Sequence, residues 1–507
     1  MKNKQIVNII NFIRAVEPRE PIDLVGTVRE QVRLMRKHGL RGTFLVQYDV
    51  LVEPAFVEIL RSLDPAQFEI GVWYEIVQGQ TEACGIPWRG RYPWDWHTHC
   101  GFSVGYTLAE REALLDVLYK TFRETFGYYP RVFGSWLFDS HTVRYLSDTY
   151  GVDALCNCKE QFGTDGYTLW GGYYGQGYYP SSDNVFLPAK GEADRIHAPL
   201  FRMLGSDPVY QYDYKQDITL PTPKIQSVLT LEPSGSAGAD PRWVDWYMRE
   251  NFNGECLSFG YTQAGQENSF GWDGMREGLL YQFALFEKLQ NEGKILVEPL
   301  GDSGRRYKAT YTDTPPSAIV AHTAFDDDER SSVWYSTKHY RVNLYGDHGA
   351  FRIRDIHVFG DVLDPYGQTV CRENHASYEA LPVIDGMRYS GLGVLAGGFI
   401  VFEDGTQPCV DDPVFTDNGD GRATVNYGEL TIKLYENGLD ILAKRPFVLE
   451  NRIGVDGGHL WKERAVDKTA IELSYLDVPY RIGVERGCAL DAKHIRSDGC
   501  VLSLVFA

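Results

Sequence analysis

Short apolar runs alternate with amphipathic segments through the N-terminal part of this chain. The apolar runs suit strands buried on both faces, and they span residues 7–12, 43–48, 68–74, 131–137, 154–158, 225–231, 257–261 and 294–298. Apolar residues at helical spacing occupy residues 24–39, 54–63, 107–126, 141–149, 243–252 and 275–291. This alternation predicts parallel strands joined by crossover helices, and about seven such strands predict a (β/α)7-type barrel.

Two long segments interrupt the alternation. Residues 88–99 are rich in Trp, Arg, Pro and His, and residues 160–220 are rich in Gly and Tyr. Neither has a clear period. We therefore expect both to be elaborated loops that follow strands and lie over the pocket.

The pattern changes near residue 300. Residues 300–317 have the Gly, Asp, Ser and Pro content of a linker. Beyond them, apolar and polar residues alternate at residues 332–336, 340–345, 350–354, 398–402 and 430–435, with Asn-Gly, Asp-Gly and Gly-Asp turns between them. The chain thus predicts an α/β barrel domain over residues 1–305 and an all-β, sandwich-like domain over residues 306–507.

Composition excludes several classes of partner. The chain has 507 residues, too many for one core, and a net charge of −19, which disfavours nucleic acid and anionic membrane surfaces. No apolar stretch is long enough to span a bilayer. Nine scattered Cys and a first segment without a cleavage site favour a reducing cytoplasm. No glycine-rich nucleotide loop is present, so no cofactor is expected.

The sequence of residues 133–142 organises the functional argument. An apolar run ends at Asp139, and Ser140 then precedes a helix. An acid at the C-terminal tip of a barrel strand faces the active-site mouth, although Asp139 could equally cap the helix. Other strand ends carry Gln47, Asp49, Glu75, Lys159, Glu160, Glu232 and Glu267. This convergence predicts an enzyme with a carboxylate-lined pocket.

Three stretches resemble a known superfamily. They are Gly-Thr-Phe-Leu-Val at residues 42–46, Phe-Glu-Ile-Gly at residues 68–71, and the helix at 107–126 with the Gly-Tyr-Tyr-Pro and Val-Phe that follow it. With them, the N-terminal part resembles the glycoside hydrolase/deacetylase superfamily, which includes polysaccharide deacetylases and glycosidases related to the α-mannosidase and α-amylase families. The resemblance implies a seven-stranded barrel that acts on carbohydrate. The β region is similar to the β domains that follow such barrels in glycosidases.

The metal motif of the deacetylases is the main departure. Deacetylases hold a divalent metal with an Asp on the first strand and two His after the third. Here the first strand ends in Asn11-Phe-Ile-Arg14, and Trp73 stands where the first metal His would be. An indole offers only an N–H donor, so we expect this metal site to be lost.

A rearranged metal site remains an alternative. His97, His99 or His197 could bind a metal together with a carboxylate such as Asp95. The competing interpretation makes the histidines at 97 and 99 polar, substrate-binding residues of a loop, with no metal.

Glycoside hydrolysis requires two carboxyl groups across the scissile bond. The stretch from Trp136 to Asp139 resembles the nucleophile-bearing strand end of α-mannosidase-type glycosidases, which implies that Asp139 is the nucleophile. The second catalytic carboxyl group should come from the sixth or seventh strand, where Glu232 and Glu267 are equal candidates. Partial burial of Glu232 would raise its pKa toward that of a usable acid.

Further residues are candidates for substrate binding. Arginine can hold a hydroxyl or carboxylate bidentately, and tryptophan can stack on a sugar; the plainer interpretations are caps, ion pairs and core packing. These candidates are Arg14, Glu17, Asp49, Glu75, Trp73, Trp96, His97, Gln266 and Trp272.

The sequence thus predicts a metal-independent glycoside hydrolase that cleaves an oligosaccharide with paired carboxylates. One alternative is a carbohydrate deacetylase with a rearranged metal site. Another is a non-catalytic carbohydrate-binding protein, for which Asp139 would lie in a salt bridge or cap. The partner in each case is an oligosaccharide or glycoside, and a homo-oligomer built through the β region stays open.

Overall fold

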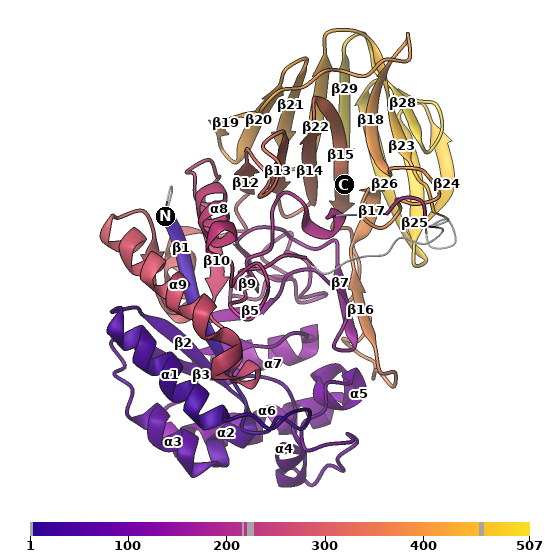
Figure 1. Ribbon diagram of the computed structural model, residues 1–507. Coiled ribbons are helices and arrows are strands. Elements are labelled where there is room, and N and C mark those ends of the chain that lie inside the picture. Colours follow the sequence, from indigo (N-terminus) through magenta and orange to yellow (C-terminus); the bar gives the residue numbers. More distant parts are fainter. Residues whose placement is uncertain (1–3, 215–216, 221–227, 456–460, 507) are drawn as a thin grey trace.

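A curled sheet of parallel strands forms the N-terminal part of the molecule, with helices along its outer face (Figure 1). The computed structural model describes residues 4–214, 217–220, 228–455 and 461–506. Along the sheet the strand order is β10-β1-β2-β3-β4-β5-β9. Their bounds are β1 (Lys4–Ile13), β2 (Gly42–Val46), β3 (Phe68–Trp73), β4 (Val132–Gly134), β5 (Ala154–Cys158), β9 (Leu200–Met203) and β10 (Phe259–Ala264).

The two edges of this sheet approach each other without pairing as strands in the part of the chain that is described. Strand β10 lies at one edge and pairs with β1, which pairs with β2 on its other side. Near the other edge, β9 pairs with β5 and with the short antiparallel strand β8 (Gly177–Tyr178). A side chain ties the edges: the backbone N–H of Leu204 donates to Gln263 Oε1 at 3.0 Å. The fold is therefore a mixed α/β structure whose parallel sheet curls without full hydrogen-bonded closure.

The predicted helices form close to their expected positions. They are α1 (Leu24–Lys37), α3 (Pro54–Arg61), α6 (Leu108–Phe126), α7 (Ser140–Tyr150), α8 (Pro241–Asn251) and α9 (Gly271–Asn291). Local chemistry fixes their ends. In α6 the hydroxyl of Thr107 accepts from the N–H of Glu110, the Glu110 carboxylate accepts from the N–H of Thr107, and Gly127 ends the helix at a φ of 85°.

The predicted sixth strand is misplaced. Residues 221–227 lie outside the described residues, and residues 228–231 contribute only an isolated bridge between Thr230 and Ser206. The sixth place belongs to β9, within a segment expected to be a loop that also holds β6 (Gln161–Thr164) and β7 (Tyr167–Trp170). Its pattern is hard to detect because β9 is short and buries Arg202, whose guanidinium lies 4.9 Å from the ring centre of Phe186.

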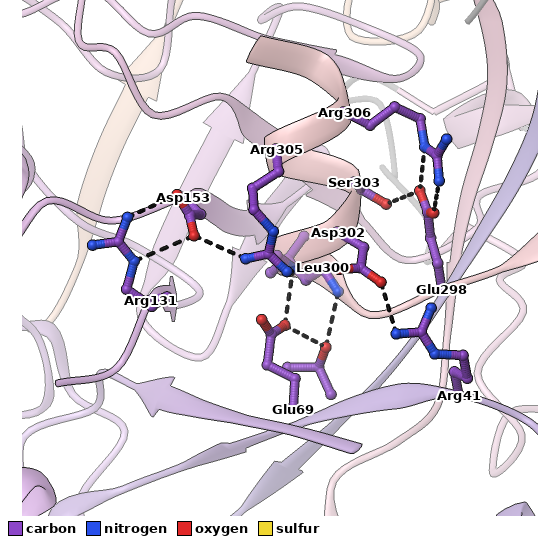
Figure 2. A network of polar contacts seen from close by, with 12 residues as sticks. Arg41, Glu69, Arg131, Asp153, Glu298, Leu300, Asp302, Ser303, Arg305 and Arg306 are labelled. Atoms are coloured by element: carbon purple, nitrogen blue, oxygen red, sulfur yellow. Dashed lines mark hydrogen bonds and ion pairs between the residues drawn. The ribbon is translucent and has the colours of Figure 1, made fainter. Parts of the chain in front are cut away.

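The expected linker is wrong in its first part, because residues Leu300–Thr310 form helix α10. This helix packs across the N-terminal ends of the strands (Figure 2). Its first N–H groups donate to side chains there: Leu300 to Thr43 Oγ1 at 2.9 Å and Gly301 to Glu69 Oε2 at 2.9 Å. A side chain at Gly304 would lie 2.3 Å from the carbonyl oxygen of Asp153, so the close approach requires glycine.

Ion pairs hold α10 in place (Figure 2). The carboxylate of Asp153 forms ion pairs with Arg131, Arg305 and Lys308, each at a distance of 2.9 Å. Just before the helix, Glu298 pairs with Arg306 at 2.6 Å. This end of the curled sheet is thereby covered, which leaves the C-terminal strand ends as the edge where a ligand can meet functional groups.

The rest of the chain forms two antiparallel sheets that pack face to face around one apolar core, which confirms the predicted all-β region (Figure 1). The first sheet holds β12 (Ser317–Ala321), β13 (Arg330–Ser336), β14 (Tyr340–Asp347), β15 (Ala350–Val358), β17 (Leu381–Asp385), β18 (Gly397–Phe402), β23 (Phe447–Arg452), β27 (Cys488–Ala489) and β28 (His494–Arg496). The second holds β19 (Val414–Gly419), β20 (Arg422–Tyr427), β21 (Leu430–Tyr435), β22 (Gly438–Ala443), β24 (Trp461–Asp467), β25 (Ala470–Tyr475), β26 (Val478–Arg486) and β29 (Val501–Phe506).

The β region is joined to the curled sheet by backbone pairing and by buried charge. Strand β16 (Ala376–Glu379) pairs in parallel with β7, and the two run side by side in Figure 1. Arg341 on β14 bridges Glu160 and Asp355, each at 2.7 Å, and all three are buried. Among the described residues, no helix combines the length and apolarity needed to cross a bilayer.

We expect Asp153→Asn to lower the free energy of unfolding by about 1–2 kcal/mol at pH 7, because three cations lose their shared carboxylate. Burial alone would raise the pKa of Asp153, but hydrogen bonds from its cations hold that pKa below its ordinary value. The stabilisation is therefore present above about pH 4 and is lost at lower pH. Urea unfolding at pH 7 and pH 3 measures it. Asp404→Asn, which removes an exposed pair with Arg445, is the matched control and should change little.

Candidate active site

Arg14, just beyond the end of β1, lies at the centre of a group of acids at the C-terminal strand ends. Its side chain is 3% exposed. One nitrogen, Nη2, lies 2.6 Å from Glu267 Oε2 and 3.4 Å from Glu75 Oε2, while Nη1 lies 3.5 Å from Glu17. Because one nitrogen contacts both, the oxygens of Glu75 and Glu267 are no farther apart than the sum of those two distances. A single guanidinium thus gathers carboxylates from three separate parts of the chain.

Glu75 follows β3 and is buried. Its Oε2 accepts from the indole of Trp73 at 3.0 Å and from the amide of Gln47. Burial raises the pKa of Glu75 to about 7, and the nearby charge of Glu267 contributes in the same direction. Near neutral pH this carboxyl group can therefore both hold and release a proton.

Glu267 lies after β10, in the Gly-Gln-Glu-Asn stretch. Besides its ion pair with Arg14, its carboxylate accepts from the hydroxyl of Ser269 at 2.8 Å. The next residue, Asn268, fixes the backbone of Arg14 on both sides: it accepts from the Arg14 N–H at 3.0 Å and donates to the Arg14 carbonyl at 2.8 Å. The end of β1 and the loop after β10 are thus locked together, which holds the Arg14–Glu267 ion pair in position.

Glu232 belongs to the same acidic group. It accepts from Thr230 Oγ1 at 2.9 Å. Burial raises the pKa of Glu232, and the charges of Glu267 and of Asp165 add to the effect. Gln266 lies beside it, where its amide donates to Ser234 Oγ at 2.8 Å. Glu232 and Glu267, both predicted as catalytic, thus lie close enough for the charge of Glu267 to raise the pKa of Glu232.

Aromatic rings cover one side of the cluster. The guanidinium of Arg14 lies 3.8 Å from the ring centre of Trp94, and that of Arg19 lies 4.9 Å from Trp94 and 5.3 Å from Trp96. Trp94 is buried, whereas Trp96 is partly exposed and lies near Tyr92 with nearly parallel rings. Stacked aromatic and guanidinium groups of this kind can form one wall of a sugar site.

Glu17 and Asp49, which the sequence predicts to bind substrate, instead stabilise the loop after β1. Glu17 pairs with Arg19 at 2.7 Å; burial alone would raise the pKa of Glu17, but the hydrogen bonds from Arg19 lower it. Asp49 accepts from the N–H of Ala15 at 3.0 Å and from its own neighbour Val50 at 2.8 Å. Burial raises the pKa of Asp49 to about 6. Glu17 contacts the guanidinium of Arg14 directly, whereas Asp49 holds the backbone of the residue that follows Arg14.

Asp139 has a different environment from the one expected for a nucleophile. It is fully buried, and it caps α7 by accepting from the N–H of Thr142 at 2.9 Å. Ser103 donates to it at 2.6 Å and Arg111 pairs with it at 2.8 Å. These contacts match the capping interpretation of the sequence, and they occupy the carboxylate that a nucleophile would need free.

The remaining aromatic candidates have mainly packing roles. Trp73 is buried and meets Phe12 and Trp136, with ring centres 4.3 and 4.9 Å away. Trp272, at the start of α9, packs against the core from a partly exposed position. Trp73 also orients Glu75, because its indole donates to Oε2, the same oxygen that Arg14 contacts.

The histidine residues do not fit a metal centre. His97 and His99 have ring centres 5.9 Å apart, but Asp95 lies 3.9 Å from His97 and is already held in two hydrogen bonds by the Arg91 side chain at 2.8 and 2.9 Å. His197 is largely exposed beside Glu192. Within the described ranges, no group of three or more His, Cys, Asp or Glu is placed to hold a metal ion.

Several contributors were not identified from sequence. The sequence marks Gln47 as a polar strand end and Trp94 as a loop aromatic that could stack on a sugar, whereas Ser269 carries no signal and Asp165 lies in a segment without periodicity. The partners of Gln47 and Trp94 are distant in the chain, so only the folded chain reveals them.

Comparisons with known proteins show the fold. No family model and no curated protein matches the chain. A candidate glycoside hydrolase/deacetylase structure from Parabacteroides distasonis matches with a TM-score of 0.56 and 14% identity, over 76% of this chain and 92% of its own. A candidate polysaccharide deacetylase from Mycobacterium smegmatis matches with a TM-score of 0.36 and 15% identity, over 61% of this chain and 92% of its own. The first shares the architecture, and the second is too distant to carry an argument.

We expect Asp139→Asn to lower the free energy of unfolding by about 3–5 kcal/mol, because the buried Arg111 loses its counter-charge. Activity per folded molecule should be retained, since Asp139 acts only through the helix that it caps. Thermal unfolding and activity corrected for the folded fraction separate the two effects. A folded Asp139→Asn protein without activity would instead place Asp139 in the reaction.

Proposed function

We propose that this protein is a hydrolase that acts on a carbohydrate, and that the reaction takes place at the carboxylates around Arg14. One observation carries the proposal: Glu75 and Glu267 contact the same guanidinium nitrogen, yet burial raises the pKa of Glu75 to about 7 while Glu267 forms the close ion pair. A carboxyl group that can hold a proton beside one that is ion-paired is what general acid and base catalysis of hydrolysis requires.

The residues divide the reaction between them. Glu75 in its protonated form donates to the leaving atom of the substrate. Glu267 in its ionised form takes a proton from water or attacks the substrate itself. Glu232, whose pKa is raised by burial, is a second acid on the same side of the sheet. Arg14 fixes both Glu75 and Glu267 so that little reorganisation is needed.

A carbohydrate substrate is supported by two features. The fold is shared with a structure described as a candidate glycoside hydrolase/deacetylase, which is an argument by analogy. The partly exposed Trp96 and the Arg19 beside it offer a flat surface of the kind that binds sugar rings.

The bond that is broken can be an acetyl linkage or a glycosidic linkage. The likeness gives glycosidic cleavage no support of its own, and the name of the structurally similar protein covers deacetylation as well. The paired carboxyl groups are compatible with either reaction, because both need a proton donor at the leaving atom and an activated water. Deacetylation is therefore the first reaction to test.

The first experiment measures products from acetylated and unacetylated glycans after dialysis against chelator. Acetate release would identify a deacetylase, and new reducing ends would identify a glycosidase. Acetate release that requires added metal would contradict the assignment to the Arg14 cluster. Absence of both products, together with retained binding of glycans, would favour the non-catalytic carbohydrate-binding alternative.

Glu267→Gln should lower the rate by about 100- to 10,000-fold, the usual contribution of a general acid or base. The matched control is Glu277→Gln, an exposed residue of α9 paired with Arg276, which should leave the rate unchanged. Initial rates on the substrate identified above provide the measurement. Equal rates for the two variants would remove Glu267 from the mechanism.

The pH profile tests Glu75 as the proton donor. The acid is active when protonated, so the rate should fall as pH rises through about 7. Glu75→Gln should lower the rate and abolish this alkaline limb, whereas Glu277→Gln should retain it. A limb that persists in Glu75→Gln would assign the titration to another group.

A further inference from the structure

A polar cavity lies on the β region, and none of the residues that line it belongs to the Arg14 cluster. It has a volume of about 380 Å³ and lies between the segment around η2 (Gln211–Asp213) and the strands β13, β14 and β15. This volume is within the range of small-molecule sites, roughly 300–1,000 Å³. Its walls combine tyrosines and paired charges with the apolar side chains of Ile218 and Leu395.

Charges of both signs line the cavity, and they are paired with each other. Arg352 pairs with Asp213, and both are more than nine-tenths buried. Arg330 Nε donates to Asp347 at 2.9 Å, and its Nη1 donates to the hydroxyl of Tyr210 at 3.1 Å. A charged ligand would have to displace one of these partners. A neutral ligand with hydroxyl groups can instead donate to the carboxylates and accept from the guanidinium groups at once.

Tyr345 provides the cavity with a hydroxyl group that is available to bind a ligand. Its side chain is 4% exposed and lines the cavity, yet its hydroxyl makes no hydrogen bond to the described part of the chain. The ring is held by two guanidinium groups, with Arg354 4.3 Å and Arg352 5.4 Å from its centre. A rigid, nearly buried tyrosine with an unused hydroxyl at a polar cavity is a specific recognition group rather than a surface residue.

From these observations we infer that this cavity binds a neutral sugar unit through Tyr345 and the Arg330–Asp347 pair, separately from the reaction at Arg14. Vicinal hydroxyls of a sugar match the alternating donors and acceptors, and the C–H face of the ring matches Ile218 and Leu395. The choice of a sugar rests on the proposed function, whereas the polarity of the cavity does not. The site would hold a carbohydrate chain on the β region while another part of it is processed.

Saturation-transfer NMR and titration calorimetry on the full chain test the inference with N-acetylglucosamine, xylose, mannose and glucuronic acid as probes. We expect at least one neutral sugar to bind, and Tyr345→Phe to weaken it roughly fivefold through the loss of one hydrogen bond. Arg330→Ala should weaken binding further. Tyr435→Phe is the matched control and should bind like the wild type, because Tyr435 lies on β21 and its hydroxyl donates to Asp440 on β22. Thermal unfolding checks that each variant is folded.

The outcomes separate this site from the catalytic one. Binding that is lost in Tyr345→Phe and retained in Glu267→Gln supports the inference. Binding that depends on Glu267 alone, preference for the charged glucuronic acid, or no binding of any probe would overturn it. If no glycan is hydrolysed but Tyr345-dependent binding persists, the proposed reaction fails while this site stands.

Discussion

The buried charge of Arg14 is the constraint on which the site depends. Three carboxylates surround one guanidinium that is almost fully removed from water, so each charge is tolerable only because the others are present. Burial, together with the nearby charge of Glu267, leaves Glu75 able to hold a proton near neutral pH, whereas Glu267 forms the closest ion pair. The two carboxyl groups therefore differ in environment although they contact the same guanidinium nitrogen.

Acidic residues lie at both ends of the strands in the curled sheet, but their partners differ between the two ends. At the N-terminal strand ends, Glu69 and Asp153 are occupied by the backbone and cations of α10. At the C-terminal ends, the acids face one another around Arg14. The same residue types therefore pair with a covering helix at one end of the sheet and with a single buried arginine at the other.

The β region also contributes contacts to the part of the chain that forms the curled sheet. Its Arg341 reaches Glu160 at the end of β5, and β16 extends the small sheet formed by β7. These contacts bury the long segment between β5 and β9, which explains why that segment carries so many Gly and Tyr residues without a regular period. The cavity around Tyr345 lies between the segment after β9, which includes η2, and the strands β13–β15, so it exists only because the two parts pack together.

The sequence by itself determined what depends on neighbours along the chain. Period and caps defined the helices, as Thr107 and Glu110 do for α6, and apolar runs located most strands and the acids that end them. Tertiary structure decided which acids meet. Arg14 contacts Glu75 and Glu267 across 61 and 253 residues, and Asp139 turns into its own helix although it too ends an apolar run. A strand end places a carboxylate at an edge, but burial and long-range partners determine its direction and charge, and no local pattern encodes them.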